Sequence, residues 1–242
     1  MPRGQKRLAR TFSTDKRLDA GDITQTDGLT AFTCFIWAYR TTAALSSKMA
    51  FKIQNAAGEG GFQFPISHLD STKWGIDIHD NNATKRLLTY NTTTNISNDS
   101  WHAHFGAWGG GNNSLLYYDT IAQTSGNVVA STPVTMQASD DNFSIGATPV
   151  GANPYTGNLA NYAMWSVDIG AIMAVALAHG VNPFVIRNDV LILYYSIAGN
   201  NDPEPQYKNG IGNATLEGTA NPPKFAGNPP VEHLSCYISG YC

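Results

Sequence analysis

Apolar and polar side chains alternate along much of this chain, with the two-residue period of half-buried β-strands. Within residues 73–79, Trp74, Ile76 and Ile78 share one side of the expected strand. Within residues 100–108, aromatic and small residues oppose two histidines. The pattern predicts strands at 31–39, 48–54, 61–66, 73–79, 85–90, 100–108, 114–121, 142–147 and 157–167.

Turn-forming residues separate these strands at short intervals. Clusters rich in glycine or asparagine occur at 57–61, 80–82, 109–113 and 124–127. Many short strands at this spacing are typical of a β-sandwich or jelly roll. We therefore expect an all-β fold, and the 242 residues allow one large domain with extensions.

One segment departs from the strand period and predicts a short helix at residues 169–180. Gly180 stands where a glycine commonly ends a helix, and Ser166 or Asp168 could cap its start. The residues that fall together on one helical face are Ile172, Val175, Ala176 and His179. After the helix, residues 189–198 predict a further strand.

Charge is sparse and unevenly distributed. Charged residues make up 14% of the sequence, and the formal net charge is −3. Residues 1–17 hold six basic side chains and one acidic, whereas the remainder holds 9 basic and 17 acidic, a net charge of −8. The basic side chains are Arg3, Lys6, Arg7, Arg10, Lys16 and Arg17. We expect residues 1–28 to be a basic arm that docks on an acidic partner, with a solvated terminus or a nucleic-acid arm as alternatives.

The sequence also limits the compartment and the redox chemistry. No apolar run reaches the ~20 residues of a membrane-spanning helix, and the N-terminus lacks the apolar core of a signal peptide. We expect synthesis in the cytoplasm and no membrane partner. Cys34 is expected to act as a small buried hydrophobe. Cys236 and Cys242 could close a small loop, although free thiols are the default in a reducing compartment.

Five segments, taken in order, resemble the strand motifs of laminin-G-like (concanavalin A-like) jelly-roll domains. They are Phe32–Tyr39, Trp101–Trp108, Ser114–Asp119, Phe143–Ala147 and Tyr155–Trp165. The resemblance covers roughly residues 29–231 and implies a β-sandwich with its jelly roll at residues 29–180, a fold used mainly for binding and display. The family has a short helix after the last of these strands. Here Gly170 and Ala171 replace its polar residues, which implies a more buried helix.

The C-terminal part carries a second resemblance. Residues 180–231 look like a C-terminal module of structural proteins in tailed bacteriophages and marine viruses. Because about 60 residues are too few for a second complete domain, we expect residues 181–242 to be an extension that completes or flanks the sandwich. The resemblance implies a virion protein made in the host cytoplasm.

Catalytic carboxylates are missing from the expected strands. Glucanases with this fold carry a Glu-x-Asp-x-Glu strand signature, which the resemblance would place in this chain, and it is absent. The glutamates, Glu59, Glu204, Glu217 and Glu232, all stand in loop-like contexts. A Gly-x-Ser-x-Gly elbow and a glycine-rich phosphate loop are absent as well. We therefore expect no enzymatic activity.

Metal ligands could come from two sets of residues. Asp77 and His79 could converge with His102 and His104 if their strands were neighbours. A Ca²⁺ site would draw on the oxygen donors Asp119, Asp140, Asp141 and Asn142, of which Asp119 and Asp141 are the candidates we retain. Polar side chains on a strand are more often plain surface, so no metal or other cofactor is expected, with this Ca²⁺ site as the alternative.

Aromatic side chains are the candidates for binding sugars. Most of them are more simply core, because large rings supply much of the buried area of a sandwich. Trp108, at a strand end beside a glycine run, and Tyr118 are the candidate glycan contacts.

These observations predict a non-enzymatic virion protein of a tailed bacteriophage. Its expected role is capsid decoration (cement), with the basic arm anchored on the major capsid protein or another virion protein and the chain assembled as a homo-oligomer. The alternative is a carbohydrate-binding module on a head fibre or tail fibre that recognises host glycans. Nucleic acid is not expected as a partner.

Overall fold

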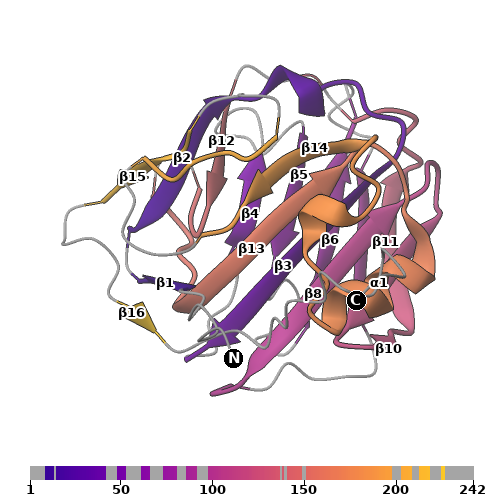
Figure 1. The fold of residues 1–242 in the computed structure, drawn as a ribbon. Helices are drawn as coiled ribbons and strands as arrows, with labels where there is room; N and C mark the ends of the chain where they lie inside the picture. Colours follow the sequence, from indigo (N-terminus) through magenta and orange to yellow (C-terminus); the bar gives the residue numbers. More distant parts are fainter. Residues whose placement is uncertain are drawn as a thin grey trace.

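Two antiparallel β-sheets packed face to face form the body of the molecule (Figure 1). The computed structural model describes residues 9–13, 15–41, 48–52, 61–65, 73–80, 86–91, 98–136, 138, 141–148, 151–197, 203–208, 213–218 and 225–226. Within these ranges each sheet has eight strands. The expectation of an all-β sandwich is confirmed.

The first sheet contains the longest strands. Its members are β1 (Ala9–Phe12), β3 (Phe32–Arg40), β8 (Trp101–Trp108), β9 (Ser114–Tyr118), β10 (Ile121–Ala122), β13 (Gly157–Trp165), β14 (Leu191–Tyr195) and β16 (Phe225–Ala226). They run in the order β10-β9-β8-β3-β13-β1-β16, and β14 also pairs with β13. The strands predicted from aromatic alternation, β3, β8 and β13, lie side by side at its centre.

The second sheet is built mostly from shorter strands. Its members are β2 (Arg17–Asp22), β4 (Lys48–Lys52), β5 (Gly61–Pro65), β6 (Gly75–His79), β7 (Arg86–Asn91), β11 (Ser125–Ser131), β12 (Asn142–Ile145) and β15 (Thr215–Glu217). They run in the order β11-β7-β6-β5-β4-β12-β2-β15.

The described part of the expected basic arm belongs to the sandwich. β1 pairs with β13 in the first sheet, and β2 pairs with β12 in the second. The apolar side chains of Phe12 and Leu18 are buried, and the 3-10 turn η1 (Thr24–Thr26) follows directly. The expectation of a separate arm over residues 1–28 is therefore wrong from residue 9 onward, because the apolar residues among the charges are strand residues. Residues 1–8 lie outside the described residues.

The described strands of the C-terminal extension enter both sheets. β14 pairs with β13, β16 pairs with β1, and β15 pairs with β2. The N-terminal strands β1 and β2 thus lie beside the C-terminal strands β16 and β15, although they are far apart in sequence. The described strands of residues 181–242 are therefore members of the two sheets.

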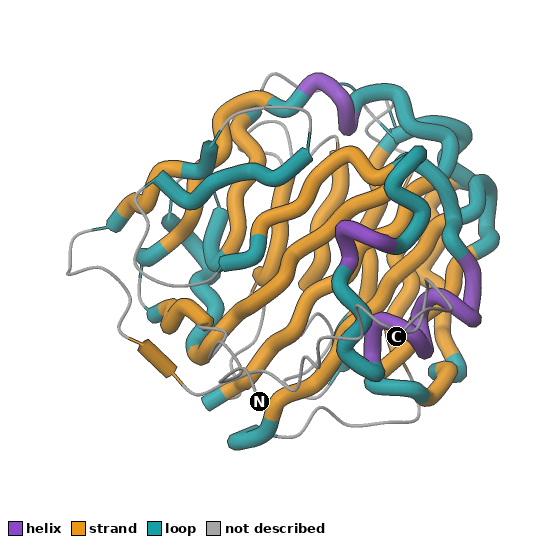
Figure 2. Tube along the Cα trace, viewed as in Figure 1, coloured by secondary structure: helices purple, strands orange, loops and turns teal. Residues whose placement is uncertain are grey.

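The core has two layers, one on each face of the first sheet. Between the sheets lie the larger aromatic side chains, among them Phe12, Phe32, Phe62, Trp74, Trp108, Tyr155 and Tyr162. On the outer face of the first sheet, Phe35 and Trp37 of β3 belong to a second cluster with Leu177 of the helix α1 (Gly170–Ala178). Figure 2 shows the helical segments at the periphery of the strand layers. β3 is therefore buried on both faces, which explains its nearly continuous apolar sequence.

The helix lies against β8 and β9. Its two ends agree with the prediction from the sequence. Gly180 has φ +88°, and its N–H donates to Leu177 O while Val181 N–H donates to Ala176 O, a Schellman ending. Asp168 Oδ1 accepts from Gly170 N–H at the start.

The face shared by Ile172, Val175, Ala176 and His179 is not the packed side of the helix. Ile172 is 80% exposed and His179 is exposed, whereas Ala174 and Leu177 are buried. The helix is apolar nearly all round, so its sequence period cannot choose the packed side. Within the described residues, no helix is long and apolar enough to cross a membrane.

A bulge at Asn161 divides β13 into two halves. The register against β3 shifts between Ala160 and Ala163, and Asn161 has φ +54°, a conformation that asparagine tolerates. β1 pairs with the half before the bulge and β14 with the half after it. Asn161 N–H donates to Ser196 O, which secures the chain that follows β14.

Candidate functional site

Three aromatic side chains form a row on the outer face of the first sheet. Phe184 belongs to the 3-10 turn η2 (Pro183–Val185), Tyr194 to β14, and Tyr207 to the segment that follows. The ring centroids of Phe184 and Tyr194 are 6.3 Å apart, and those of Tyr194 and Tyr207 are 5.7 Å apart. Phe184 is 36% exposed and Tyr207 is 49% exposed, while Tyr194 is buried between them. We call these three residues the aromatic row.

Hydrogen bonds hold each member of the row in place. Asn182 Oδ1 caps the turn by accepting from Phe184 N–H at 2.9 Å. The hydroxyl of Tyr194 donates to Asn161 Oδ1 at 3.1 Å. Tyr207 N–H donates to Tyr194 O at 3.0 Å. The rings are therefore presented by a fixed backbone, so little ordering entropy is lost when something stacks on them.

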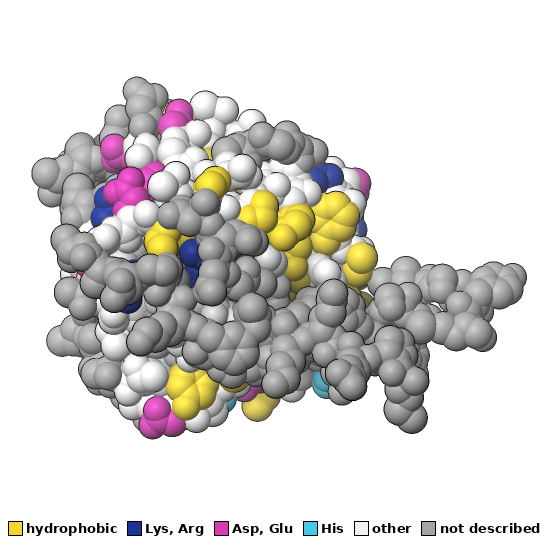
Figure 3. Space-filling view, turned by 60° about the vertical axis from the view of Figure 1, so that its left-hand side comes forward, with side chains coloured by type: hydrophobic (Ala, Val, Ile, Leu, Met, Phe, Trp, Pro, Cys, Tyr) yellow, Lys and Arg dark blue, Asp and Glu magenta, His cyan; other side chains and the backbone are white. Residues whose placement is uncertain are grey.

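Polar groups border the row. The Arg187 guanidinium donates to both carboxylate oxygens of Asp189, at 3.1 and 3.0 Å. Lys208 Nζ donates to the carbonyl and to the side-chain oxygen of Asn188, both at 2.6 Å. The hydrogen bond from Arg187 lowers the pKa of the Asp189 carboxyl, so this border stays charged. Figure 3 shows a face where hydrophobic side chains gather beside basic and acidic ones.

A second group of polar residues lies at the end of β8. Ser100 Oγ is 2.6 Å from His102 Nε2, and His102 Nδ1 is 2.8 Å from Asp119 Oδ2. A carboxylate can only accept, so Nδ1 carries the proton, and in the neutral ring Nε2 accepts from the Ser100 hydroxyl. Ala103 N–H holds the other oxygen of Asp119 at 2.9 Å. We call Ser100, His102 and Asp119 the His102 relay.

Buried polar side chains surround this relay. His104 lies between Trp74 and Tyr118, with ring centroids 4.9 and 5.2 Å away. Burial, and then the nearby charge of His102, lowers the pKa of His104 to about 3. Arg40 Nε donates to Asn98 Oδ1 at 2.7 Å, and burial lowers the pKa of Arg40.

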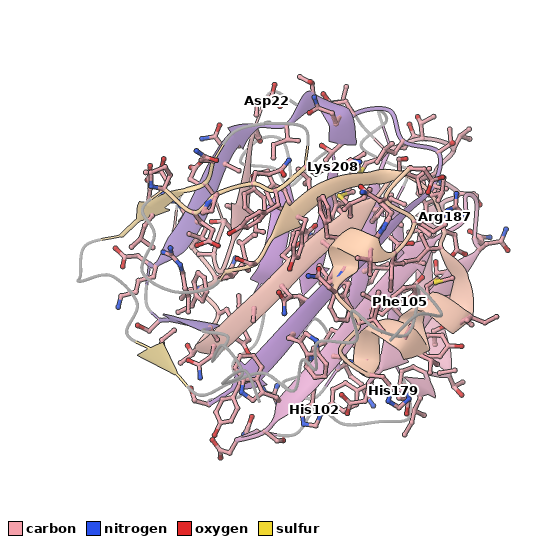
Figure 4. The ribbon with its side chains drawn as sticks, viewed as in Figure 1. Asp22, His102, Phe105, His179, Arg187 and Lys208 are labelled. Atoms are coloured by element: carbon pink, nitrogen blue, oxygen red, sulfur yellow. The ribbon has the colours of Figure 1, made fainter. Side chains whose placement is uncertain are left out.

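Asp119 keeps its charge in these surroundings. Burial of the Asp119 carboxyl raises its pKa, but the hydrogen bonds from His102 and Ala103 outweigh this and lower it overall. In Figure 4, His102 lies well away from Arg187 and Lys208, so the relay and the aromatic row are separate places on the molecule.

Two of the expected arm residues are engaged within the chain. Arg10 is buried and donates through Nη2 to Glu204 Oε2 at 2.9 Å, and Arg17 forms an ion pair with Glu217. Lys16 lies in the turn before β2. The role expected for Arg10, an exposed contact to a partner, therefore conflicts with its place in the fold. The remaining arm residues, Arg3, Lys6 and Arg7, lie outside the described residues.

Both candidate glycan contacts are interior residues. Trp108 is fully buried, packs against Phe32 and donates through its indole N–H to Gly111 O at 2.9 Å. Tyr118 is buried, with its ring stacked on His102. The expectation that they contact a glycan does not fit this placement. On their strands, the side that carries these rings faces the second sheet.

The expected metal-ligand sets do not come together. Asp77 and His79 lie on β6 in the second sheet, whereas His102 and His104 lie on β8 in the first. Ile76 and Ile78 belong to the core between the sheets, so Asp77 and His79 point the other way.

The described residues also hold no other metal-ligand group. Asp119 is engaged with His102, Asp141 lies just before β12, and Asp140 lies outside the described residues. No group of three metal-ligating side chains occurs in the described part of the chain.

Only one of the three cysteines lies within the described residues. Cys34 is buried as expected, and burial raises the pKa of its thiol to about 12. Cys236 and Cys242 lie outside the described residues.

Sequence reasoning missed the aromatic row and the hydroxyl of the relay. The one available signal for Phe184 was Asn182-Pro183, an asparagine cap with proline at the first helical position. Tyr207 carries no local signal, because only the bridge between Tyr195 and Gln206 brings it to β14.

The segment that contains most of these strands matches a known protein family. A sequence profile described as the concanavalin A-like lectin/glucanases superfamily matches residues 12–171, which include the strands from β2 to β13. The chain belongs to this superfamily. The laminin-G-like, concanavalin A-like resemblance read from the strand motifs is thereby confirmed. No curated protein matches the sequence.

Solved structures share the fold of this superfamily member. A proposed carbohydrate-binding protein from Bacteroides ovatus aligns with a TM-score of 0.64 and 15% identity, over 90% of this chain and 62% of that one. This chain therefore spans less than two thirds of that protein's length. The heptameric SAP-like pentraxin of Limulus polyphemus aligns with a TM-score of 0.44 and 10% identity, over 94% and 92% of the two chains. The second likeness is too weak to bear on function.

Proposed function

We propose that this chain is a carbohydrate-binding domain and that the aromatic row is its sugar-binding surface. The observation that carries the proposal is the pair of exposed rings, Phe184 and Tyr207, each packed against Tyr194 on a fixed backbone. Membership of a superfamily of lectins and glucanases supports it. The fold shared with the proposed carbohydrate-binding protein of Bacteroides ovatus agrees with it.

The row has the two kinds of group that sugar recognition needs. The C–H face of a pyranose is apolar and stacks on an aromatic ring, while its hydroxyls need planar donors and acceptors. Arg187, Asn188 and Asp189 supply such groups at one border, and Lys208 supplies a cation at the same border. Because two exposed rings flank Tyr194, the surface offers more than one ring to a sugar chain, so an oligosaccharide fits better than a single sugar.

The test is binding to a glycan array, followed by calorimetry with the oligosaccharide that gives the strongest signal. We expect Tyr207→Ala and Phe184→Ala each to weaken binding by roughly tenfold, since a ring contact contributes about 0.5–1.5 kcal/mol beyond its buried area. Ile172→Ala is the matched control, because Ile172 is an exposed apolar residue of α1 outside the row. Binding by the folded wild type that neither row variant changes would refute the assignment of this surface.

The virion role remains a second proposal, supported by the basic residues Arg3, Lys6 and Arg7 and by the phage-like C-terminal sequence. β1 begins at Ala9, so an arm deletion must stop at residue 8 to keep the described sandwich. We expect the full chain to co-sediment with undecorated phage capsids and the variant lacking residues 1–8 to stay in solution. Failure of the full chain to sediment would reject capsid decoration, and equal sedimentation of both forms would reject the arm as the anchor.

A further inference from the structure

The His102 relay has the connectivity of a nucleophilic serine site, and sugar binding at the aromatic row does not use it. We propose that Ser100 is a nucleophile, activated by His102 and Asp119, that hydrolyses small carboxylic esters. The site lies apart from the aromatic row, so this activity is additional to the proposed sugar binding and does not depend on it.

The order of the hydrogen bonds is the first argument. Asp119 accepts from His102 Nδ1 at 2.8 Å, which leaves Nε2 as the basic nitrogen, 2.6 Å from Ser100 Oγ. A serine hydrolase needs this arrangement, in which a carboxylate fixes the tautomer and the free nitrogen takes the hydroxyl proton. Reversal of either bond would leave no base for the serine.

The relay is held by backbone contacts. Asp119 has φ +55° and exchanges two hydrogen bonds with Ala103, through its own N–H and its Oδ1. The imidazole of His102, which bonds to Asp119, is fixed as well, because it stacks on Tyr118 with ring centroids 4.5 Å apart. Stacking and hydrogen bonding together restrict the imidazole to one orientation, as preorganised catalysis requires.

The relay is partly exposed to solvent. The side chain of His102 is 16% exposed and that of Asp119 is 38% exposed, and Ser100 is half-buried. Ser100 directly precedes β8 and His102 lies at the start of that strand, while Asp119 directly follows β9.

The backbone of Arg40 lies opposite that of Ser100. The register of β3 and β8 sets Tyr39 opposite Trp101, so Arg40 follows opposite Ser100, and Arg40 O accepts from Asp99 N–H at 2.8 Å. The Arg40 side chain is buried and its Nε donates to Asn98, two residues before Ser100, which makes Arg40 the candidate to stabilise the negative charge that develops on an ester oxygen under attack. Sequence reasoning did not single out Arg40.

Two further buried atoms lie in the same region of the sandwich. His104 Nδ1 and the hydroxyl of Tyr155 have no hydrogen-bond partner in the part of the chain that the structure describes. His104 contacts Tyr118, and Tyr155 interacts electrostatically with Arg40. Buried polar atoms without partners carry a desolvation cost.

The reaction balances with water as the only co-reactant. Ser100 Oγ attacks the carbonyl carbon and its proton passes to His102 Nε2, while Asp119 stabilises the imidazolium. The ester C–O bond breaks, the leaving alkoxide takes the proton from His102, and an acyl group remains on Ser100. Water then attacks the acyl carbon, gives one proton to His102, and Ser100 regains that proton as the acid leaves.

Two measurements test the proposal on the full chain. The first is covalent labelling with a fluorophosphonate probe, read by peptide mass spectrometry. We expect Ser100 to be labelled in the wild type, and much more slowly in His102→Gln. Ser166→Ala is the control, since Ser166 bonds to Val190 O outside the relay and should leave labelling unchanged. Absence of label on Ser100 in the folded wild type overturns the proposal without recourse to any variant.

The second measurement is hydrolysis of p-nitrophenyl acetate. We expect Ser100→Ala and Asp119→Asn to lose activity by on the order of 10³-fold, with sugar binding unchanged. Wild-type turnover that survives Ser100→Ala would also overturn the assignment. The glycan array reports separately on the aromatic row, so failure of one proposal is distinguishable from failure of the other.

Discussion

At the scale of single residues, burial keeps His104 uncharged. His104 is buried among Trp74, Tyr118 and the first sheet, and its pKa is lowered to about 3 because burial penalises the imidazolium. His102, two residues earlier, is partly exposed and faces a carboxylate instead. The same side of one strand therefore holds a histidine that stays neutral and a histidine with an anionic partner.

The neutral state of His104 predicts how stability changes with pH. In the unfolded chain this side chain titrates near pH 6.5, whereas in the folded chain it titrates near 3. Between these values the unfolded state binds more protons, so stability is full above about pH 6.5 and falls as the pH drops towards 3. We expect His104 to account for a loss on the order of 1–2 kcal/mol between pH 6.5 and pH 4.5.

Urea unfolding at pH 7 and at pH 4.5 measures this loss. His104→Gln is the comparison variant, because the glutamine side chain is polar but stays neutral at pH 7 and at pH 4.5. The free energy of unfolding of the variant should fall less with pH than that of the wild type. An equal fall in both proteins would show that His104 does not drive the acid sensitivity.

At the scale of elements, the alternation of apolar and polar residues predicted the central strands well. Each of these strands buries side chains on one face or on both, which leaves a clear pattern in the sequence. The cores of β3, β8 and β13 were expected within a few residues of their observed bounds. The strands β1, β2 and β15 were missed because each is short or rich in charge, and its pairing depends on a distant partner. Local pattern carries no information about such pairing.

Local sequence also left the two candidate sites incomplete. Alternation placed His102 and His104 on one side of a strand, which is correct. It could not supply Asp119 as the partner of His102, since that contact follows from the β8–β9 register, which pairs His104 with Tyr118. The aromatic row joins three segments through the bulge at Asn161 and a single bridge, so only the tertiary structure assembles it.

At the scale of the whole molecule, a buried ion pair joins the N-terminal strand β1 to the segment beyond β14. Arg10 on β1 and Glu204 beyond β14 are 194 residues apart in sequence, and both are buried. Ser196 Oγ donates to the other oxygen of Glu204 at 3.1 Å, and the Glu204 backbone exchanges two hydrogen bonds with Ala214. The pair therefore connects an edge of the jelly roll to the C-terminal extension.

This connection predicts an asymmetric cost of mutation. Arg10→Met leaves the Glu204 carboxylate buried without its cation, which we expect to destabilise the protein by about 3–5 kcal/mol. Glu204→Gln in the same background removes the uncompensated charge and should recover part of that loss. Thermal unfolding of the two single variants and the double variant gives the coupling. The result that would contradict this is simple additivity of the two single-variant losses in the double variant. In that case the ion pair does not hold β1 to the segment beyond β14, and strand pairing such as that of β1 with β13 fixes the N-terminal segment.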